Sequence, residues 1–137
     1  MSNTIQRVDY FYTTAKDQPG EAYRLLAQLA DLGINLLAFN AVPVGPNSTQ
    51  LTLFPEESWL LTDAADKTGL RLDGPHHAIL IQGDDKLGAL AEVHQVLYKA
   101  NVNVYASNAV SNGKGGYGYL IFVRPEDYEK AATALHI

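Results

Sequence analysis

The sequence contains no cysteine, which excludes disulfide bonds, thiolate metal ligands and cysteine nucleophiles. Positive charge is also scarce, because 10 Lys and Arg residues stand against 15 Asp and Glu residues and give a net charge of −5 at pH 7. A broad phosphate-binding surface needs the opposite balance. The composition therefore argues against a nucleic-acid partner and, more weakly, against anionic membranes.

Long apolar runs are absent as well, and none approaches the roughly 18–20 residues that cross a bilayer. The opening Met1-Ser2-Asn3-Thr4 has neither the charge nor the apolar stretch of a secretion signal. We therefore expect a soluble, cytoplasmic protein with no membrane partner.

What the chain does contain is an ordinary globular composition, with 137 residues of which 47% are hydrophobic and 18% charged. This length fits one medium domain or two small ones of about 65 residues. A domain that small is marginal alone, so two of them are expected to share an interface.

Two stretches of the chain repeat one another at a distance of 68 positions, so that 16–42 align with 84–110 without a gap. Identical residues in the two copies are Asp17/Asp85, Gly20/Gly88, Leu29/Leu97, Asn35/Asn103, Ala38/Ala106 and the run Asn40-Ala41-Val42/Asn108-Ala109-Val110. Gly33, which ends the first helical pattern, is replaced by Asn101, the other residue that tolerates a left-handed backbone. The repeat therefore predicts the same turn–helix–strand backbone twice.

The periodicity extends this unit to strand–helix–strand–strand–helix in each copy. In the first copy we expect strands at 5–14, 35–44 and 49–54, helices at about 20–32 and 55–67, and a short fourth strand at 70–73. In the second copy we expect strands at 77–82, 102–110 and 117–123 and helices at 86–100 and 125–135, with no room for a final strand. Asp17 is the expected N-cap of the first helix, with Pro19 at its first position.

This pattern predicts an α+β fold of two ferredoxin-like βαββαβ units, domain 1 in 1–73 and domain 2 in 76–137. Each antiparallel sheet would carry its helices on one face, and its open face and edge would need a partner. Gly74-Pro75 is the expected boundary. Pro55-Glu56 matches Pro125-Glu126 at a distance of 70, which we attribute to a two-residue insertion in the turn between the second and third strands.

The polar residues show no catalytic or metal-binding signature, and there is no Gly-x-Ser-x-Gly. His76 and His77 would point to opposite faces of a strand, which makes them poor ligands for one metal. His94 takes the place of Leu26 and is interpreted as a histidine at the edge of the core. Asp84-Asp85 is explained by a turn and a helix start. We predict no catalytic residue, no metal and no cofactor.

Gly116-Tyr-Gly-Tyr-Leu-Ile-Phe122 resembles the third-strand motif of RNA-recognition domains, in which exposed aromatics stack on bases. The strand expected to carry the partner motif, Ala78–Ile81, has no aromatic residue, the chain is acidic, and the first copy lacks the motif. RNA binding through Tyr117 and Tyr119 is thus an alternative that three observations disfavour.

A more extensive resemblance rests on Asp17-Gln18-Pro19-Gly20, a leucine-rich helix and Leu32-Gly33-Ile34-Asn35, followed in the second copy by Lys86-Leu87-Gly88-Ala89-Leu90 and Asn101-Val102-Asn103-Val104. Both sets resemble the Pro-Gly, hydrophobic helix, Gly-Ile-Asn signature of the ACT domain, a regulatory amino-acid-binding module. The second copy departs from it, with Leu87 for Pro and Asn101-Val102 for Gly-Ile.

This resemblance implies a non-enzymatic regulatory or sensor protein that forms a homodimer. The domains of this family pair side by side and bind an amino acid or similar metabolite at their interface. The Gly88 turn would face Asn35, the Gly20 turn would face Asn103, and Asp17 or Asp85 would pair with an ammonium group. A helix N-terminus suits a carboxylate. The implied ligand-binding residues are Asp17, Gln18, Pro19, Gly20, Asn35, Leu36, Asp84, Asp85, Lys86, Leu87, Gly88, Ala89, Asn103 and Val104.

Two alternatives remain open at this point. Asn35 and Asn103 can equally be strand-entry residues with no ligand, and the mid-strand Asn40 and Asn108 are interpreted as interface hydrogen-bonding groups. The whole chain can also be a regulatory subunit that docks on an enzyme through its open sheets and binds no small molecule.

Overall fold

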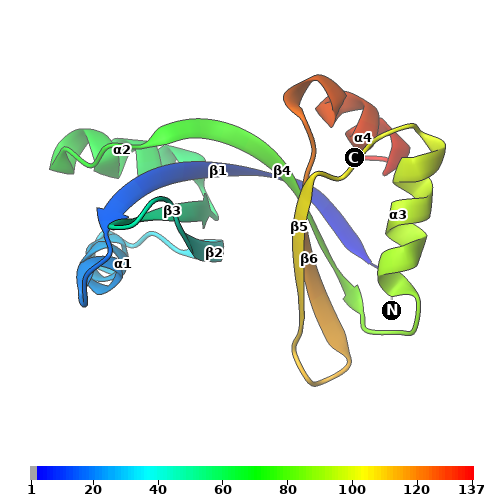
Figure 1. The fold of residues 1–137 in the computed structure, drawn as a ribbon, viewed down its shortest axis with the longest axis horizontal. Helices are drawn as coiled ribbons and strands as arrows, with labels where there is room; N and C mark the ends of the chain where they lie inside the picture. The colour runs from blue at the N-terminus through cyan, green and yellow to red at the C-terminus, as the bar shows by residue number, and fades with distance from the viewer. Residues whose placement is uncertain (1–2) are drawn as a thin grey trace. The chain divides into compact units, whose positions relative to one another are not determined.

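The computed structural model describes residues 3–137 (Figure 1). Met1 and Ser2, on which part of the signal-peptide prediction rests, lie outside the described residues. The elements are β1 (Thr4–Lys16), α1 (Glu21–Asp31), β2 (Leu36–Pro43), β3 (Ser48–Pro55), α2 (Ser58–Thr68), β4 (Asp73–Asp84), α3 (Ala89–Lys99), β5 (Ala106–Ser111), β6 (Gly116–Phe122), the 3-10 turn η1 (Pro125–Asp127) and α4 (Tyr128–Ala134).

The chain forms two compact units. One, here called the N-terminal unit, is Asp9–His76, and the other, the C-terminal unit, combines Met1–Val8 with His77–Ile137. The division differs from the predicted domain ranges in placing the first eight residues with the second repeat. Both β1 and β4 therefore contribute residues to both units.

The N-terminal unit has the strand order β2-β3-β1-β4, with β3 antiparallel to both β1 and β2. Helices α1 and α2 pack on this sheet through Leu25, Leu29 and Leu61, which meet Phe11 and Leu53 in a buried cluster. All five side chains are at most 8% exposed. The predicted ferredoxin-like arrangement is confirmed for this unit.

The C-terminal unit has the strand order β1-β4-β6-β5, with β6 antiparallel to both β4 and β5. Its core joins Val93 and Leu97 of α3, Ala131 of α4, and Ile79 and Ile121 of the sheet. Figure 1 shows α3 and α4 on the same side of β4 and β6. This is the second ferredoxin-like unit.

The first half of β1 supplies the strand that the second repeat lacks. Ile5 packs against the C-terminal core, and a methyl group on Gly83 would collide with the side chain of Asn3. Arg7 reaches α4, where its two terminal nitrogens lie 2.7 and 3.1 Å from the carboxylate oxygens of Glu129. The chain's own N-terminus thus occupies the position of the missing final strand.

Two local predictions were wrong. The expected strand at 70–73 does not form as a separate element, because residues 70–72 lie outside the strands and β4 runs from Asp73 through Gly74-Pro75 to Asp84. The two-residue insertion does not lie in the hairpin turn, because Pro43 pairs with Thr49 and Ser111 with Tyr117, a distance of 68 on both sides of each turn. The distance of 68 is kept as far as the equivalent pairs Ala38/Phe54 and Ala106/Phe122. The two extra residues therefore follow β6, at Val123-Arg124. An insertion there lengthens a connection without disturbing a ladder.

Within residues 3–137, no helix is long and apolar enough to cross a membrane. The same residues hold no group of three or more His, Asp or Glu side chains placed to bind a metal ion. His76 lies against Tyr10 and Tyr12, whereas His77 lies against Tyr128, as expected for neighbours on opposite faces of a strand.

Deletion of residues 1–8 should destabilise the C-terminal unit, because it exposes the β4 edge and removes the buried contacts of Ile5 and Val8. We expect a loss of about 2 kcal/mol or more in the free energy of unfolding, from about 1.5–3 kcal/mol for each fully buried aliphatic side chain. Urea unfolding monitored by amide NMR gives the measurement. Deletion of residues 1 and 2 is the control, and equal stability of the two truncations would contradict the strand assignment.

The Arg7–Glu129 pair should make stability depend on acid pH. Its hydrogen bond holds the pKa of the Glu129 carboxyl below the ordinary value of 4.5 and raises the pKa of Arg7. A carboxyl with a depressed folded pKa contributes stability that is fully present above its unfolded pKa and is lost as pH falls through the folded pKa. Glu129→Gln should therefore lower the melting temperature slightly at pH 7 and flatten its decline below pH 4.5, whereas Glu126→Gln should leave the wild-type decline in place.

Candidate functional site

The duplicated turns before α1 and α3 have the same hydrogen-bonded backbone. Asp17 N–H donates to Asn47 O at 2.9 Å, and Asp85 N–H donates to Gly115 O at 2.9 Å, tying each turn to the hairpin of its own unit. Arg24 N–H donates to Gly20 O, and Glu92 N–H donates to Gly88 O, at 3.0 and 3.1 Å. Each bond has its counterpart 68 positions later, which confirms the repeat at the level of atoms.

The helix caps explain which residues of the repeat are identical. Gly20 and Gly88 are the N-caps of α1 and α3, with φ of 89° and 84°. Asp17 was predicted to be the N-cap, and this was wrong, because the turn needs three more residues and a left-handed cap that only glycine adopts readily. At the other end, Gly33 and Asn101 have φ of 74° and 60°, which confirms the predicted equivalence.

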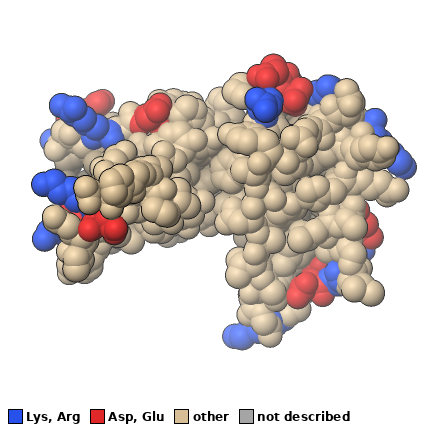
Figure 2. All heavy atoms as spheres, in the orientation of Figure 1, with Lys and Arg blue, Asp and Glu red and all other residues tan. Residues whose placement is uncertain are grey.

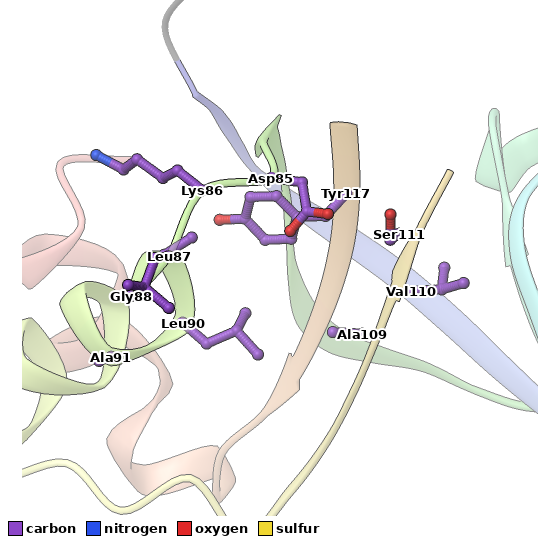
Figure 3. A pocket seen from close by; sticks show the side chains of 11 residues that line it. Asp85, Lys86, Leu87, Gly88, Leu90, Ala91, Ala109, Val110, Ser111 and Tyr117 are labelled. Atoms are coloured by element: carbon purple, nitrogen blue, oxygen red, sulfur yellow. The ribbon is translucent and has the colours of Figure 1, made fainter. Parts of the chain in front are cut away.

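A cleft of about 580 Å³ opens at the start of α3 (Figure 3). The Asp85–Gly88 turn and the first residues of α3 form one wall, and the end of β5 and the start of β6 form the other. The lining residues are Asp85, Lys86, Leu87, Gly88, Ala89, Leu90, Ala91, Ala109, Val110, Ser111 and Tyr117. All of them belong to the C-terminal unit.

The turn brings unpaired backbone donors to this cleft. The N–H groups of Leu87, Gly88, Leu90 and Ala91 have no hydrogen-bond acceptor among residues 3–137. The start of a helix leaves such donors free, and its dipole gives them a positive potential. At the rim, Lys86 Nζ lies 3.3 Å from Glu92 Oε1. The cleft therefore combines free N–H groups with an exposed carboxylate, that of Asp85.

Tyr117 is the buried polar residue of the cleft. It is 8% exposed, and its hydroxyl has no hydrogen-bond partner in the described structure. In Figure 3 its side chain extends from β6 toward the turn, and the hydroxyl points toward Lys86 and Leu87. Burial, with a smaller effect from the Glu92 carboxylate, raises the pKa of this phenol above its ordinary value. An unpaired buried hydroxyl costs about 1–3 kcal/mol.

The predicted site residues fall into two groups. Asp85, Lys86, Leu87, Gly88 and Ala89 line the cleft, while Asp84, Asn103 and Val104 of the same unit are not among its lining residues. In the N-terminal unit, Asp17, Gln18, Pro19 and Gly20 form the exposed turn before α1, Leu36 begins β2, and Asn35 Nδ2 donates to Glu56 Oε2 at 3.0 Å. It stays a prediction that Asn35 faces the Gly88 turn and that Asn103 faces the Gly20 turn.

The second wall of the cleft was not predicted from the sequence. Ala109, Val110 and Ser111 enter it from β5, and Tyr117 enters from β6. One signal was available, because alternation along β6 puts Tyr117, Tyr119 and Ile121 on one face. That face is the helix-covered one, since all three belong to the C-terminal core.

The same burial overturns the RNA-binding alternative. Tyr117 and Tyr119 are 8% and 4% exposed, so neither ring offers a face to a base. Tyr119 instead lies with its hydroxyl 2.5 Å from His94 Nε2 and 3.0 Å from Ser107 Oγ. Lys and Arg side chains are scattered among Asp and Glu on the face drawn in Figure 2.

Comparison with known proteins gives one relative and several similar structures. No protein-family model matches the chain. The β chain of a probable L-serine dehydratase from Bacillus subtilis is 35% identical over 91 residues, which cover 58% of this chain. This chain spans 41% of the length of that relative.

Several solved structures match nearly the whole chain. A protein from Bacteroides thetaiotaomicron has a TM-score of 0.80 at 17% identity, covering 96% of this chain and 88% of its own. The regulatory subunit of aspartate kinase from Thermus thermophilus has a TM-score of 0.62 at 18% identity, with 98% and 94% covered. The chain has the fold of a tandem pair of ACT domains.

The edge strands of the two units differ in exposure. All six residues of β5 are exposed, Val110 to 72%, and the neighbouring Tyr105 is 57% exposed. In the N-terminal unit, Asn40 of β2 is half-buried, whereas its repeat partner Asn108 is exposed. Interface hydrogen bonding by these two amides stays a prediction.

Tyr117→Phe should stabilise the protein, because it removes a buried hydroxyl that has no partner and keeps the ring in the core. We expect a gain of up to about 1 kcal/mol in the free energy of unfolding. Chemical denaturation measures it, with Tyr119→Phe as the matched control. Tyr119→Phe breaks two hydrogen bonds and should destabilise. A destabilised Tyr117→Phe protein would mean that the hydroxyl is satisfied in solution.

Proposed function

We propose that this chain is a non-enzymatic regulatory protein that binds an amino acid, or a similar small carboxylate, in the cleft at Gly88. One observation carries the proposal. The residues that line a cleft of about 580 Å³ carry four unpaired N–H groups and a buried tyrosine hydroxyl without a partner. Small-molecule sites commonly measure about 300–1,000 Å³ and hold a few convergent polar groups.

The polar groups of the cleft suit the two ends of an α-amino acid. The ligand carboxylate accepts hydrogen bonds from the N–H groups of Gly88, Leu90 and Ala91, where the helix dipole favours negative charge. The Asp85 carboxylate pairs with the ammonium group. Leu90 and Val110 offer an apolar surface to the side chain, and Ser111 offers a hydroxyl.

The relatives support a regulatory role. The similar structure from Thermus thermophilus is a regulatory subunit of aspartate kinase, and the relative from Bacillus subtilis is the β chain of a probable L-serine dehydratase. Both names belong to proteins of amino-acid chemistry. By analogy, we propose that this chain senses an amino acid and passes the signal to an enzyme of the same kind in a cytoplasmic setting.

A homodimer follows from the exposed edge of the C-terminal sheet. β5 ends the strand order, so one side of its backbone has no neighbouring strand. An exposed edge that carries Val110 invites pairing with another chain. The same edge supports the second candidate function, a regulatory subunit that docks on an enzyme and binds no small molecule.

A thermal-shift screen of the twenty standard L-amino acids tests the binding proposal. A ligand at 100 times its Kd stabilises the folded protein by about 2.7 kcal/mol, which is a rise of several degrees in Tm. Gly88→Val should abolish the rise, since a β-branched residue at φ 84° distorts the turn and places methyl groups at the cleft.

The matched control is Gly45→Val. Gly45 has φ of 82° and free space around it, and it does not line the cleft. This variant carries a similar backbone strain and should keep the ligand response. If no amino acid raises Tm, or if both variants respond alike, binding at Gly88 fails. A stable enzyme partner without a ligand then favours the docking candidate.

A further inference from the structure

The two duplicated turns differ in chemistry although their backbones agree. We propose that only the α3 turn accepts a carboxylate, and that Glu21 closes the α1 turn to such ligands. The physiological identity of the carboxylate rests on the proposed function. The selectivity between the turns rests on the residues of this chain.

The α1 turn has fewer donors. Leu87, whose N–H is unpaired, corresponds to Pro19, which has no N–H to offer. The α1 turn is left with the free N–H groups of Gly20, Ala22 and Tyr23. The α1 turn therefore has one free N–H group fewer than the α3 turn.

The α1 turn also carries its own carboxylate. Ala89, the first residue of α3, corresponds to Glu21, the first residue of α1. Glu21 Oε2 lies 2.7 Å from Arg24 Nη1, so the carboxylate is held at the first helical turn. This carboxylate, paired with Arg24, already occupies the positive end of the helix dipole, where another anion would bind.

The pairing of charges is reversed in the other copy. Arg24 corresponds to Glu92, which pairs with Lys86 at the rim of the α3 cleft. The first position of α3 keeps the small, neutral Ala89. The N–H groups of Gly88, Leu90 and Ala91 beside it remain open to a ligand.

Tyr117 is a second observation, independent of the helix N-terminus, that supports a ligand at the α3 turn. It is 92% buried with no partner for its hydroxyl, whereas the corresponding residue of the first copy is the half-buried Thr49. A buried hydroxyl without a partner is costly, and a ligand group that pairs with it recovers that cost. The inference is one carboxylate per chain, bound in the C-terminal unit.

Sodium acetate is the probe that separates the two turns without knowledge of the natural ligand. The full chain, labelled with ¹⁵N, is titrated with acetate at constant ionic strength kept by sodium chloride. We expect saturable shifts at the amides of Gly88, Leu90 and Ala91, and none at those of Gly20, Ala22 and Tyr23.

Reciprocal variants test the cause. Ala89→Glu should weaken acetate binding at α3 about fivefold, the equivalent of about 1 kcal/mol from a charge at a helix end. Ala89→Gln, of the same size without the charge, should bind as wild type does. Glu21→Gln should make the α1 amides respond to acetate.

Equal shifts at the two turns, or shifts at neither, would overturn the inference. So would an Ala89→Gln protein as weak as Ala89→Glu, because bulk rather than charge would then decide. Acetate selectivity together with a silent amino-acid screen would leave the inference standing and reject the proposed function. If an amino acid binds with two molecules per chain, the inference is rejected and the proposed function stands.

Discussion

The fourth strand of the C-terminal sheet comes from β1, and much of this structure follows from that pairing. After α4, residues 135–137 form no strand. A ferredoxin-like sheet with three strands would leave the β4 edge open beside a buried core. Thr4–Val8 covers that edge, so the first residues of the chain stabilise the last unit. Arg7 secures the arrangement by bonding both Glu129 and the backbone oxygen of Ile137.

Local features of the fold could be predicted from the sequence, and features that depend on distant pairing could not. Gly20 with Gly88, and Gly33 with Asn101, mark positive φ at equivalent points, so the repeat could be read without a structure. The N-cap was misplaced from Gly20 to Asp17 because an aspartate before Pro-Gly has the composition of a cap. The insertion was misplaced because Pro55 and Pro125 match, and only strand register locates the extra residues after Phe122.

In the candidate site, too, the part that is local in sequence was predicted and the part that depends on strand pairing was not. The Asp85–Ala89 wall is continuous in sequence and was predicted. The opposite wall comes from residues 109–117, and its position depends on the antiparallel pairing of β5 with β6. Tyr117 was singled out for the wrong reason, as a surface for bases. Alternation along β6 gives two possible faces, and the choice between them depends on where α3 and α4 pack. Its neighbour Tyr119 is buried equally well but is bonded to His94 and Ser107.

This contrast between the two tyrosines bears on why the duplicated units have diverged. A structural tyrosine satisfies its hydroxyl, as Tyr119 does, and phenylalanine would fill the same volume where no bond is available. Tyr117 retains a hydroxyl that costs stability in the ligand-free chain. A cost of this kind is expected at functional sites, where local rules yield to ligand chemistry. The first copy carries Thr49 there and adds the Glu21–Arg24 pair, so its turn is complete without a ligand. Duplication supplied two similar backbones, and the side chains at three pairs of positions, 19 and 87, 21 and 89, and 49 and 117, gave them different chemistry.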